Sequence, residues 1–371
     1  MKTIYKFSLA MGFAVTMMTS AAHASINVTI DPDGAGPNGN STVSGLDWNT
    51  GNALALPTGY SMDLATGDIS DTGTTNATSL AVGDILQTYV QGNLSAFNGP
   101  SINVTGLNSD FEWTVVAAIS EVVTNISTNA LTGAQTADFA NLDAATTAAL
   151  GGKNYFYVFS GPVNWNALLG SGFTDGALVM SGTVDGYNTT TAIGTSSFQA
   201  KPTTTCNPAD TSGCQALDQF GSQDNYSDAN VTTIAGQGSG DAYVTVDQAS
   251  INPAYIKSAL TSLVLTYQTS LNLPYANQDP SDCFTLPAAE GGTTLTALGD
   301  KLNAADTPVG GTACSANPST VGSVNGIDGP NELIQIDASN NFEGETIPEP
   351  ASLALLGVGL IGMGFAKRRK V

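Results

Sequence analysis

Residues 111–126 begin with Phe111-Glu112-Trp113-Thr114-Val115-Val116-Ala117-Ala118-Ile119 and end at Ile126. β-Branched and aromatic residues of this kind are typical of strands. Clusters of Gly, Ser, Thr, Asn and Asp separate this stretch from shorter runs of the same character, at residues 26–30, 85–90, 155–159, 177–184, 242–246 and 333–336. Short strands divided by turn clusters indicate antiparallel β architecture. We therefore predict a mainly β fold, an antiparallel β-sandwich-like ectodomain.

One or two short helices are expected within this β-rich region. Residues 137–150 are rich in alanine and end at Gly151-Gly152, which is typical of a helix C-terminus. A second helix is predicted near residue 251, because Asn252 suits an N-cap and Pro253 suits the first helical position. The continuation at residues 263–267 fits a helix or a strand equally well.

The N-terminus resembles an export signal. Residues 1–6 carry two lysines, an apolar run follows from residue 7 to about 18, and Ala22-His23-Ala24 forms a small-x-small pattern. Signal peptidase reads this order of positive region, apolar core and cleavage box. We predict a signal peptide at residues 1–24, cleaved between Ala24 and Ser25.

The C-terminus, residues 347–371, contains three blocks in a fixed order. Pro348-Glu349-Pro350 comes first, and its prolines favour extended backbone. An apolar segment, residues 351–366, then provides roughly 24 Å of helix, enough for a single short transmembrane helix. The basic cluster Lys367-Arg368-Arg369-Lys370 closes the chain, and by the positive-inside rule it forms a cytoplasmic stop. An ordinary, permanent membrane anchor is the alternative interpretation.

These three blocks resemble the PEP-CTERM sorting signal of Gram-negative bacteria that make exopolysaccharide. The resemblance implies export through the inner membrane, transient anchoring by the C-terminal helix, and processing near Pro348-Glu349-Pro350 by exosortase, a membrane-embedded cysteine transpeptidase. The mature protein would then reach the cell surface or the extracellular matrix. Residues 25–346 would form its extracellular region.

The charge balance of this region excludes whole classes of partner. Residues 25–347 contain four lysines, no arginine and 30 of the 31 acidic residues, a net charge of −26. Such a surface repels nucleic acid and anionic membranes, because phosphate binding depends on Lys and Arg. Divalent cations and neutral polymers remain as partners. We predict no nucleic-acid binding.

The mature chain also lacks most catalytic side chains. The single histidine, His23, lies in the predicted signal peptide, so Ser-His-Asp catalysis, Cys-His catalysis and imidazole metal sites are excluded. A carboxylate pair of the glycosidase type remains chemically possible, but no local motif selects two of the 30 acids. We predict no catalytic residue and no enzyme activity.

Four cysteines remain in the exported region, and an even number favours disulfides. Of the three possible pairings, Cys206–Cys214 and Cys283–Cys314 are favoured, because each closes a short polar segment. A metal site is the alternative, although no two cysteines have the spacing of a zinc knuckle. Residues 186–240, which contain the first pair, are poor in apolar runs and suggest a linker or a long loop.

A candidate calcium site follows the first predicted strand. Asp31 and Asp33 alternate within a glycine-rich turn and offer carboxylate oxygens to Ca²⁺. However, Ala35 and Thr42 stand where an EF-hand loop needs oxygen ligands. An ordinary Asx-type turn is therefore the favoured interpretation. No other cofactor is predicted.

Several segments are similar to flocculation-associated PEP-CTERM proteins: residues 30–36, 46–48, 51–55, 112–116 and 335–342. This second resemblance implies a role in holding cells within exopolysaccharide flocs, and it carries over no catalytic residue. We therefore expect a non-enzymatic matrix protein that associates with exopolysaccharide and supports floc or biofilm formation. The alternatives are a secreted carboxylate-pair glycosidase and a calcium-dependent adhesin.

Overall fold

The computed structural model describes residues 26–34, 36, 38–73, 80–131, 135–166, 170–185, 195–202, 234–270, 283–292, 294–296 and 332–343. All of them belong to the compact unit formed by residues 25–343; a second unit combines residues 1–24 with residues 344–371. The predicted signal peptide and the sorting signal therefore lie outside the described residues. Cys206, Cys214 and Cys314 also lie outside them.

The described part of the chain is mainly antiparallel β-sheet, which confirms the predicted fold class. Its longest strands are β4 (Gly51–Met62), β6 (Asp84–Asn98), β7 (Glu112–Thr128), β12 (Ile234–Val246) and β16 (Glu332–Glu343). The remaining elements of the large sheet are β3 (Gly45–Trp48), β5 (Ile69–Asp71), β8 (Gln135–Asn141), β9 (Tyr155–Gly161), β10 (Ala177–Asp185), β11 (Thr195–Pro202) and β13 (Ser262–Ser270). Two small hairpins pair β1 (Val28–Ile30) with β2 (Ser41–Val43), and β14 (Cys283–Thr285) with β15 (Thr294–Thr296).

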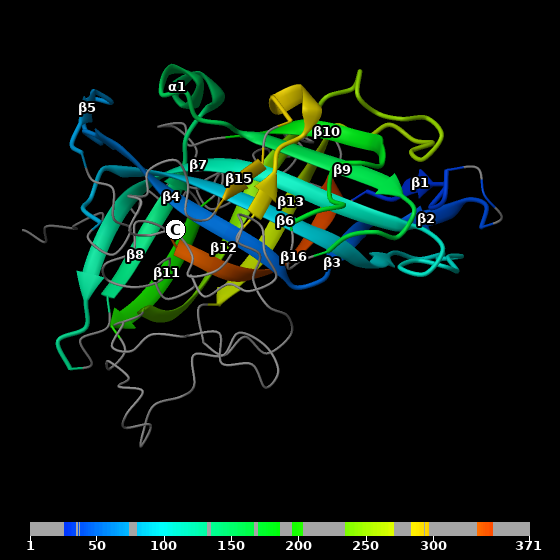
Figure 1. The fold of residues 1–371 in the computed structure, drawn as a ribbon, viewed down its shortest axis with the longest axis horizontal. Coiled ribbons are helices and arrows are strands. Elements are labelled where there is room, and N and C mark those ends of the chain that lie inside the picture. Colours follow the sequence, from blue (N-terminus) through cyan, green and yellow to red (C-terminus); the bar gives the residue numbers. More distant parts are fainter. Residues whose placement is uncertain are drawn as a thin grey trace, which may run out of the picture. The chain divides into compact units, whose positions relative to one another are not determined.

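The large sheet closes on itself. Following the pairings from β6 leads to β7, β9, β10, β12, β13 and β16, and β16 pairs with β3 and β4, both of which pair with β6 again. β3 and β4 act as one long strand, because they occupy successive positions along the same two neighbours. The chain thus brings β16 (orange in Figure 1) beside the blue strands near its start. Closure pairs the backbone groups that an open sheet leaves at its edges.

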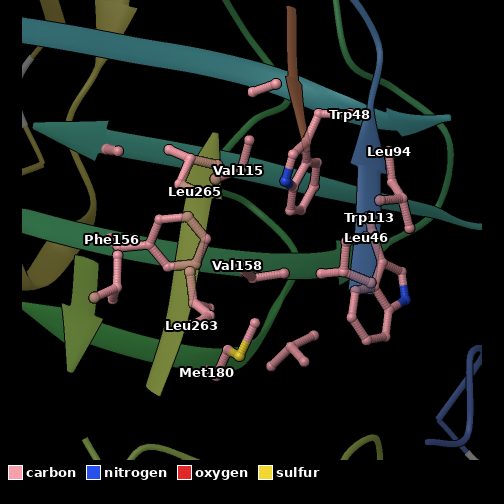
Figure 2. Close-up of a cluster of buried hydrophobic side chains, with 14 of the residues drawn as sticks. Leu46, Trp48, Leu94, Trp113, Val115, Phe156, Val158, Met180, Leu263 and Leu265 are labelled. Carbon is pink, nitrogen blue, oxygen red and sulfur yellow. The ribbon is translucent and has the colours of Figure 1, made fainter. Parts of the chain in front are cut away.

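Residues 112–128, which include most of the apolar stretch at 111–126, form β7, and this strand pairs with β6, β8 and β9. β7 is buried over residues 112–123, and its odd-numbered residues Trp113, Val115, Ala117 and Ile119 face the main core. Figure 2 shows part of that core, where side chains from β3, β6, β7, β9, β10 and β13 meet. Successive side chains of a strand point to opposite faces of the sheet. A run that is apolar throughout can therefore form one strand when both faces are covered.

The opposite face of β7 packs against a second apolar cluster. Val116 and Ala118 contact Tyr155 and Phe159 of β9 together with Phe173 and Leu286. Glu290, in the 3₁₀ turn Ala288–Glu290, accepts hydrogen bonds from Lys153 Nζ (2.8 Å) and from the Tyr157 hydroxyl (3.2 Å). The aromatic run at residues 155–159 is therefore buried on both faces or nearly so, rather than exposed on one.

The helix predictions were only partly right. Of residues 137–150, the first five belong to β8 and only Ala144–Ala149 form a helix, α1, which ends before Gly151 as expected. Asp143 caps this helix by accepting a 2.8 Å hydrogen bond from Thr146 N. The helix predicted from Asn252 is wrong: Asn252 Oδ1 accepts from Ala254 N within a turn, and residues 262–270 form strand β13.

Candidate functional site

The sheet divides into two branches between β7 and β12. Residues 112–118 of β7 pair with β9, whereas residues 121–128 pair with β8. In the same way, residues 243–246 of β12 pair with β10, whereas residues 234–240 pair with β11. β9–β10 therefore bridge the two long strands at one end, and β8–β11 bridge them at the other.

A cleft of about 390 Å³ lies on the β8–β11 branch. It is lined by residues from five strands: Thr124, Asp138, Phe139, Ser196, Ser239, Gly240, Asp241 and Thr266. Four of these residues carry hydroxyl groups and two carry carboxylates. The partly buried ring of Phe139 packs against the apolar cluster of Ala55, Leu86 and Val123. Hydroxyl and carboxylate groups together can hydrogen-bond with the hydroxyls of a sugar.

The two carboxylates of the cleft are held by neighbouring side chains. Asp138 Oδ2 accepts a 2.9 Å hydrogen bond from Asn125 Nδ2, and Asp241 Oδ1 accepts a 2.8 Å bond from the Thr266 hydroxyl. Each bond engages one oxygen of its carboxylate and fixes the orientation of the group. The cleft thus brings together two acids that are 103 positions apart in the sequence.

The electrostatic character of the cleft follows from its lining. None of the eight lining residues is basic. Of the two lysines whose side chains the structure describes, Lys153 forms an ion pair with Glu290 at 2.8 Å, and Lys257 lies 3.7 Å from Asp31. Both are thus engaged with acids that lie outside the cleft lining.

A buried carboxyl group lies behind the cleft. Glu121 is only 8% exposed; its Oε1 accepts from the Ser196 hydroxyl and its Oε2 from the Thr88 hydroxyl, both at 2.9 Å. Burial raises the pKa of Glu121, and the two hydroxyl bonds offset part of that rise. Ser196 belongs to both groups, because it lines the cleft and also holds Glu121.

Tyr267 and Gly240 lie beside Ser196, and together with Glu121 we call these residues the inner layer. Burial raises the pKa of the Tyr267 hydroxyl strongly, and the negative charges of Glu121 and Asp241 raise it further. Gly240 leaves the room that the tyrosine ring needs, since a Cβ at this position would lie 2.7 Å from Tyr267 Cζ and 2.6 Å from Ser196 Cβ. Any larger residue at position 240 would displace the side chains that hold Glu121.

Asn141 faces Glu121 directly across the β7–β8 pair. Opposed residues of an antiparallel pair project to the same face of the sheet, so the amide lies next to the inner layer. Asn141 is fully buried, and neither its Oδ1 nor its Nδ2 has a hydrogen-bond partner among the described residues. Next to the inner layer there is thus a buried amide without a hydrogen-bond partner among the described residues.

The predicted calcium residues lie elsewhere, in the turn after β1. Asp33 Oδ1 accepts from Gly36 N at 2.9 Å, and its Oδ2 accepts from Asn38 N at 3.1 Å and from Asn38 Nδ2 at 3.0 Å. These bonds form the Asx-type turn that was the favoured interpretation. The ammonium group of Lys257 lies beside Asp31 and donates to the carbonyls of Pro253 and Ala254. Calcium binding by Asp31 and Asp33 stays a prediction.

Three of the segments that carry the second resemblance, residues 46–48, 51–55 and 335–342, lie next to one another in the sheet. Residues 335–342 of β16 pair with β3 and with the beginning of β4. Trp48 Nε1 donates a 2.9 Å hydrogen bond to Asn340 Oδ1, and Trp113 Nε1 donates a 2.7 Å bond to the carbonyl of Pro32. Segments far apart in the sequence thus lie side by side: residues 46–55 with residues 335–342, and Pro32 with Trp113.

Trp48 and Trp165 stand in turn-rich stretches of the sequence, and this pattern alone predicts that both lie at the surface. The prediction for Trp48 is wrong, because its ring is 3% exposed and packs in the main core (Figure 2). Trp165 is half-buried and packs against Phe173, with ring centroids 6.4 Å apart. The surface prediction failed for Trp48 because this residue ends the short strand β3 and its indole reaches across to Asn340 of β16.

The cleft residues were not found from the sequence. Asp138, Asp241 and Ser196 occur in no motif, and only the pairing of β8, β11 and β12 brings them together. Of the predicted cysteines, Cys283 begins β14, but the structure does not describe its side chain. Within the described ranges, no helix has the length and hydropathy that a membrane span requires.

Comparison with known proteins bears on the C-terminus. Residues 346–370 match the family model of the PEP-CTERM protein-sorting motif. This match confirms the first resemblance and includes Pro348-Glu349-Pro350 and the basic cluster. The comparisons with curated proteins and with solved structures found no match.

Proposed function

Starting from a chain that carries the PEP-CTERM motif and is thus an exported substrate of exosortase, we propose that the mature protein associates with exopolysaccharide and supports floc or biofilm formation. The cleft on the β8–β11 branch is the contact site. Its combination of hydroxyls and carboxylates carries the proposal. The second resemblance adds support, because three of its segments pair with one another in the sheet.

The charge of the chain agrees with this role. A chain with 30 acidic residues and four lysines between the predicted signal peptide and the motif is repelled by nucleic acid and anionic lipid. Polysaccharide hydroxyls, in contrast, are good donors to carboxylates. An extended polymer also contacts many copies of the protein at once, so that weak individual contacts combine into stable retention.

Gene deletion and complementation test the proposal in the producing bacterium. Deletion should reduce the polysaccharide that stays with sedimented cells, and the intact gene should restore it. A gene with Asp138→Asn and Asp241→Asn should not restore it, although the protein is exported. A matched control, Asp68→Asn with Asp110→Asn, removes the same charge from exposed positions outside the cleft and should restore retention.

The location of the protein is measured in the same strains. A variant with Pro348→Ala and Pro350→Ala should accumulate unprocessed, as shown by the mass of its C-terminus, and should fail to restore retention. If deletion leaves both polysaccharide retention and flocculation unchanged, the proposed function is wrong. If the cleft variant restores retention fully, the function stands but the cleft is not its site.

A second candidate function rests on one observation, the presence of two acids in a single cleft. Carboxylate-pair glycosidases use two such groups on either side of the scissile bond. Incubation of the protein with the matrix polysaccharide distinguishes the two functions. A binding protein releases no reducing ends, whereas a glycosidase releases them, and Asp138→Asn or Asp241→Asn would then abolish the release.

A further inference from the structure

The carboxylates of the cleft point to a particular class of polysaccharide. Asp138 comes from β8 and Asp241 from β12, and Thr124, Ser239 and Thr266 line the same cleft. A neutral sugar uses such a site through hydrogen bonds alone. A sugar that carries an ammonium group gains a charge-assisted hydrogen bond in addition, and these bonds are roughly twice as strong as neutral ones.

The orientation of both acids suits a cationic donor. One oxygen of Asp138 is engaged with Asn125 and one oxygen of Asp241 is engaged with Thr266. These bonds hold each carboxylate in place before a ligand arrives, so that less side-chain freedom is lost on binding. The second oxygen of each group can then accept from the ligand.

The surroundings leave the negative potential of the two aspartates uncompensated, since none of the residues that line the cleft is basic. The two lysines with described side chains are paired with Glu290 and Asp31. An anionic polysaccharide is therefore repelled by the cleft, whereas an amino sugar neutralises it.

On these grounds, and resting on the proposed function, we propose that the cleft binds polysaccharide segments that contain unacetylated amino sugars. The protonated amine lies between Asp138 and Asp241, and the sugar hydroxyls bond with the side chains of Ser239 and Thr266. Recognition involves no covalent step. The acetylated form of the same sugar lacks the positive charge, so its amide gains no ionic attraction from the two carboxylates.

Two oligosaccharides that differ only in this feature provide the test. Oligomers of β-1,4-linked glucosamine and of N-acetylglucosamine have the same ring and linkage. Calorimetric titration of the exported protein at mildly acidic pH, where the amine is protonated, should show binding of the glucosamine oligomer with a Kd at least tenfold lower than that of the acetylated oligomer. Added salt should weaken this binding, because the contact is ionic.

Substitutions then assign the binding to the cleft. Asp138→Asn and Asp241→Asn should each raise the Kd for the glucosamine oligomer by about tenfold. The double control, Asp68→Asn with Asp110→Asn, removes equal charge at exposed positions and should leave the Kd within about twofold. Thermal unfolding of every variant verifies that the fold is retained, and Thr266→Ala provides a second, smaller change that releases Asp241 from its hydrogen bond.

The outcomes separate this inference from the function on which it rests. Equal Kd values for the two oligomers would overturn it, since the protonated amine would then contribute nothing to binding. Equal loss of affinity in the cleft and control variants would also overturn it, since general surface charge would explain the binding. If the protein binds the isolated matrix polysaccharide or the acetylated oligomer but not glucosamine, the amino-sugar inference is wrong and the proposed function stands. If it binds no polysaccharide at all, both are wrong.

Discussion

The Ser196 hydroxyl donates a 2.9 Å hydrogen bond to Oε1 of Glu121, and so connects a residue of the cleft to a carboxyl group inside the closed sheet. The Thr88 hydroxyl holds the other oxygen at the same distance. Because Ser196 lies on β11 and Glu121 on β7, which are not neighbours in the sheet, this bond spans the width of β8. The acid is thereby coupled to the wall of the site.

Glu121 makes stability depend on pH. Burial raises its pKa in the folded protein, so the folded state binds a proton that the unfolded chain, with a carboxyl pKa of about 4.3, releases. The contribution of Glu121 is fully present below the unfolded pKa and is lost as pH rises through the folded one. Glu121→Gln keeps the hydrogen-bonding shape without the charge. We expect its urea midpoint to exceed that of the unsubstituted protein at neutral pH and to depend less on pH.

The comparison for this prediction is Asp68→Asn at the exposed end of the β4–β5 hairpin. This substitution removes one exposed charge and no buried charge. It should therefore leave the dependence of the urea midpoint on pH unchanged. Urea unfolding followed by tryptophan fluorescence between pH 4 and 8, roughly the range where stability is usually greatest, measures both. A Glu121→Gln profile parallel to that of the unsubstituted protein contradicts the prediction.

The Trp48–Asn340 hydrogen bond joins β3 to β16, which are the third and the last strand of the described residues. Asn340→Ala should lower the free energy of unfolding by about 1–3 kcal/mol, because it leaves the buried indole N–H of Trp48 without its acceptor. The double variant with Trp48→Phe should cost less than the sum of the two single changes. A double-mutant cycle from chemical denaturation gives the coupling energy, and additive effects would show that the bond contributes nothing.

Trp113 fixes the turn that follows β1 to the core. Its ring is fully buried and makes edge contacts with Phe97 and Tyr255, at centroid distances of 5.0 and 5.9 Å. Trp113→Ala should cost about 3–5 kcal/mol through the cavity that it leaves. Trp113→Phe keeps most of the apolar volume and should cost about 1–3 kcal/mol, since the Pro32 carbonyl loses its donor. Equal destabilisation by both substitutions would contradict the prediction that the lost ring volume costs more than the lost hydrogen bond.

The turn at Asp33 discriminates between the two interpretations made for it. Its oxygens accept three hydrogen bonds from Gly36 and Asn38. We expect Asp33→Ala to lower the Tm whether or not calcium is present, and millimolar calcium to leave the Tm of the unsubstituted protein unchanged. A Tm that rises with calcium, and that no longer does so in Asp33→Ala, would instead support the adhesin alternative.

The N-terminal cap of α1 gives a second, opposite pH effect. Burial would raise the pKa of Asp143, but the hydrogen bonds from Thr146 and Ala145 outweigh it and lower the pKa. The stability due to this cap is present above the unfolded pKa and is lost as pH falls through the folded one. Asp143→Ala should cost about 1 kcal/mol at neutral pH and less in acid. Hydrogen exchange of the α1 amides measures the local loss directly.

The pattern of residues predicted some elements well and others poorly. β7 was predictable because it combines aromatic and β-branched residues over a length that no turn residue interrupts. Residues 137–141 were misassigned to a helix because alanine favours helices locally, whereas the neighbours β7 and β11 offer this segment a place in the sheet. Tertiary pairing overrides such a weak preference. The same competition turned Asn252-Pro253 into a turn before β13.

What the sequence determined by itself is the destination and the chemical limits of this protein. The order of motif, apolar segment and basic cluster is local, so it could be read without a fold, and the absence of histidine and arginine from residues 25–347 needs no coordinates. Only the tertiary structure decided which carboxylates meet. Asp138 and Asp241 share a cleft, and Glu121 is enclosed behind it, because strands distant in the sequence pair to close the sheet. Long-range pairing of this kind leaves no mark in the spacing of residues along the chain.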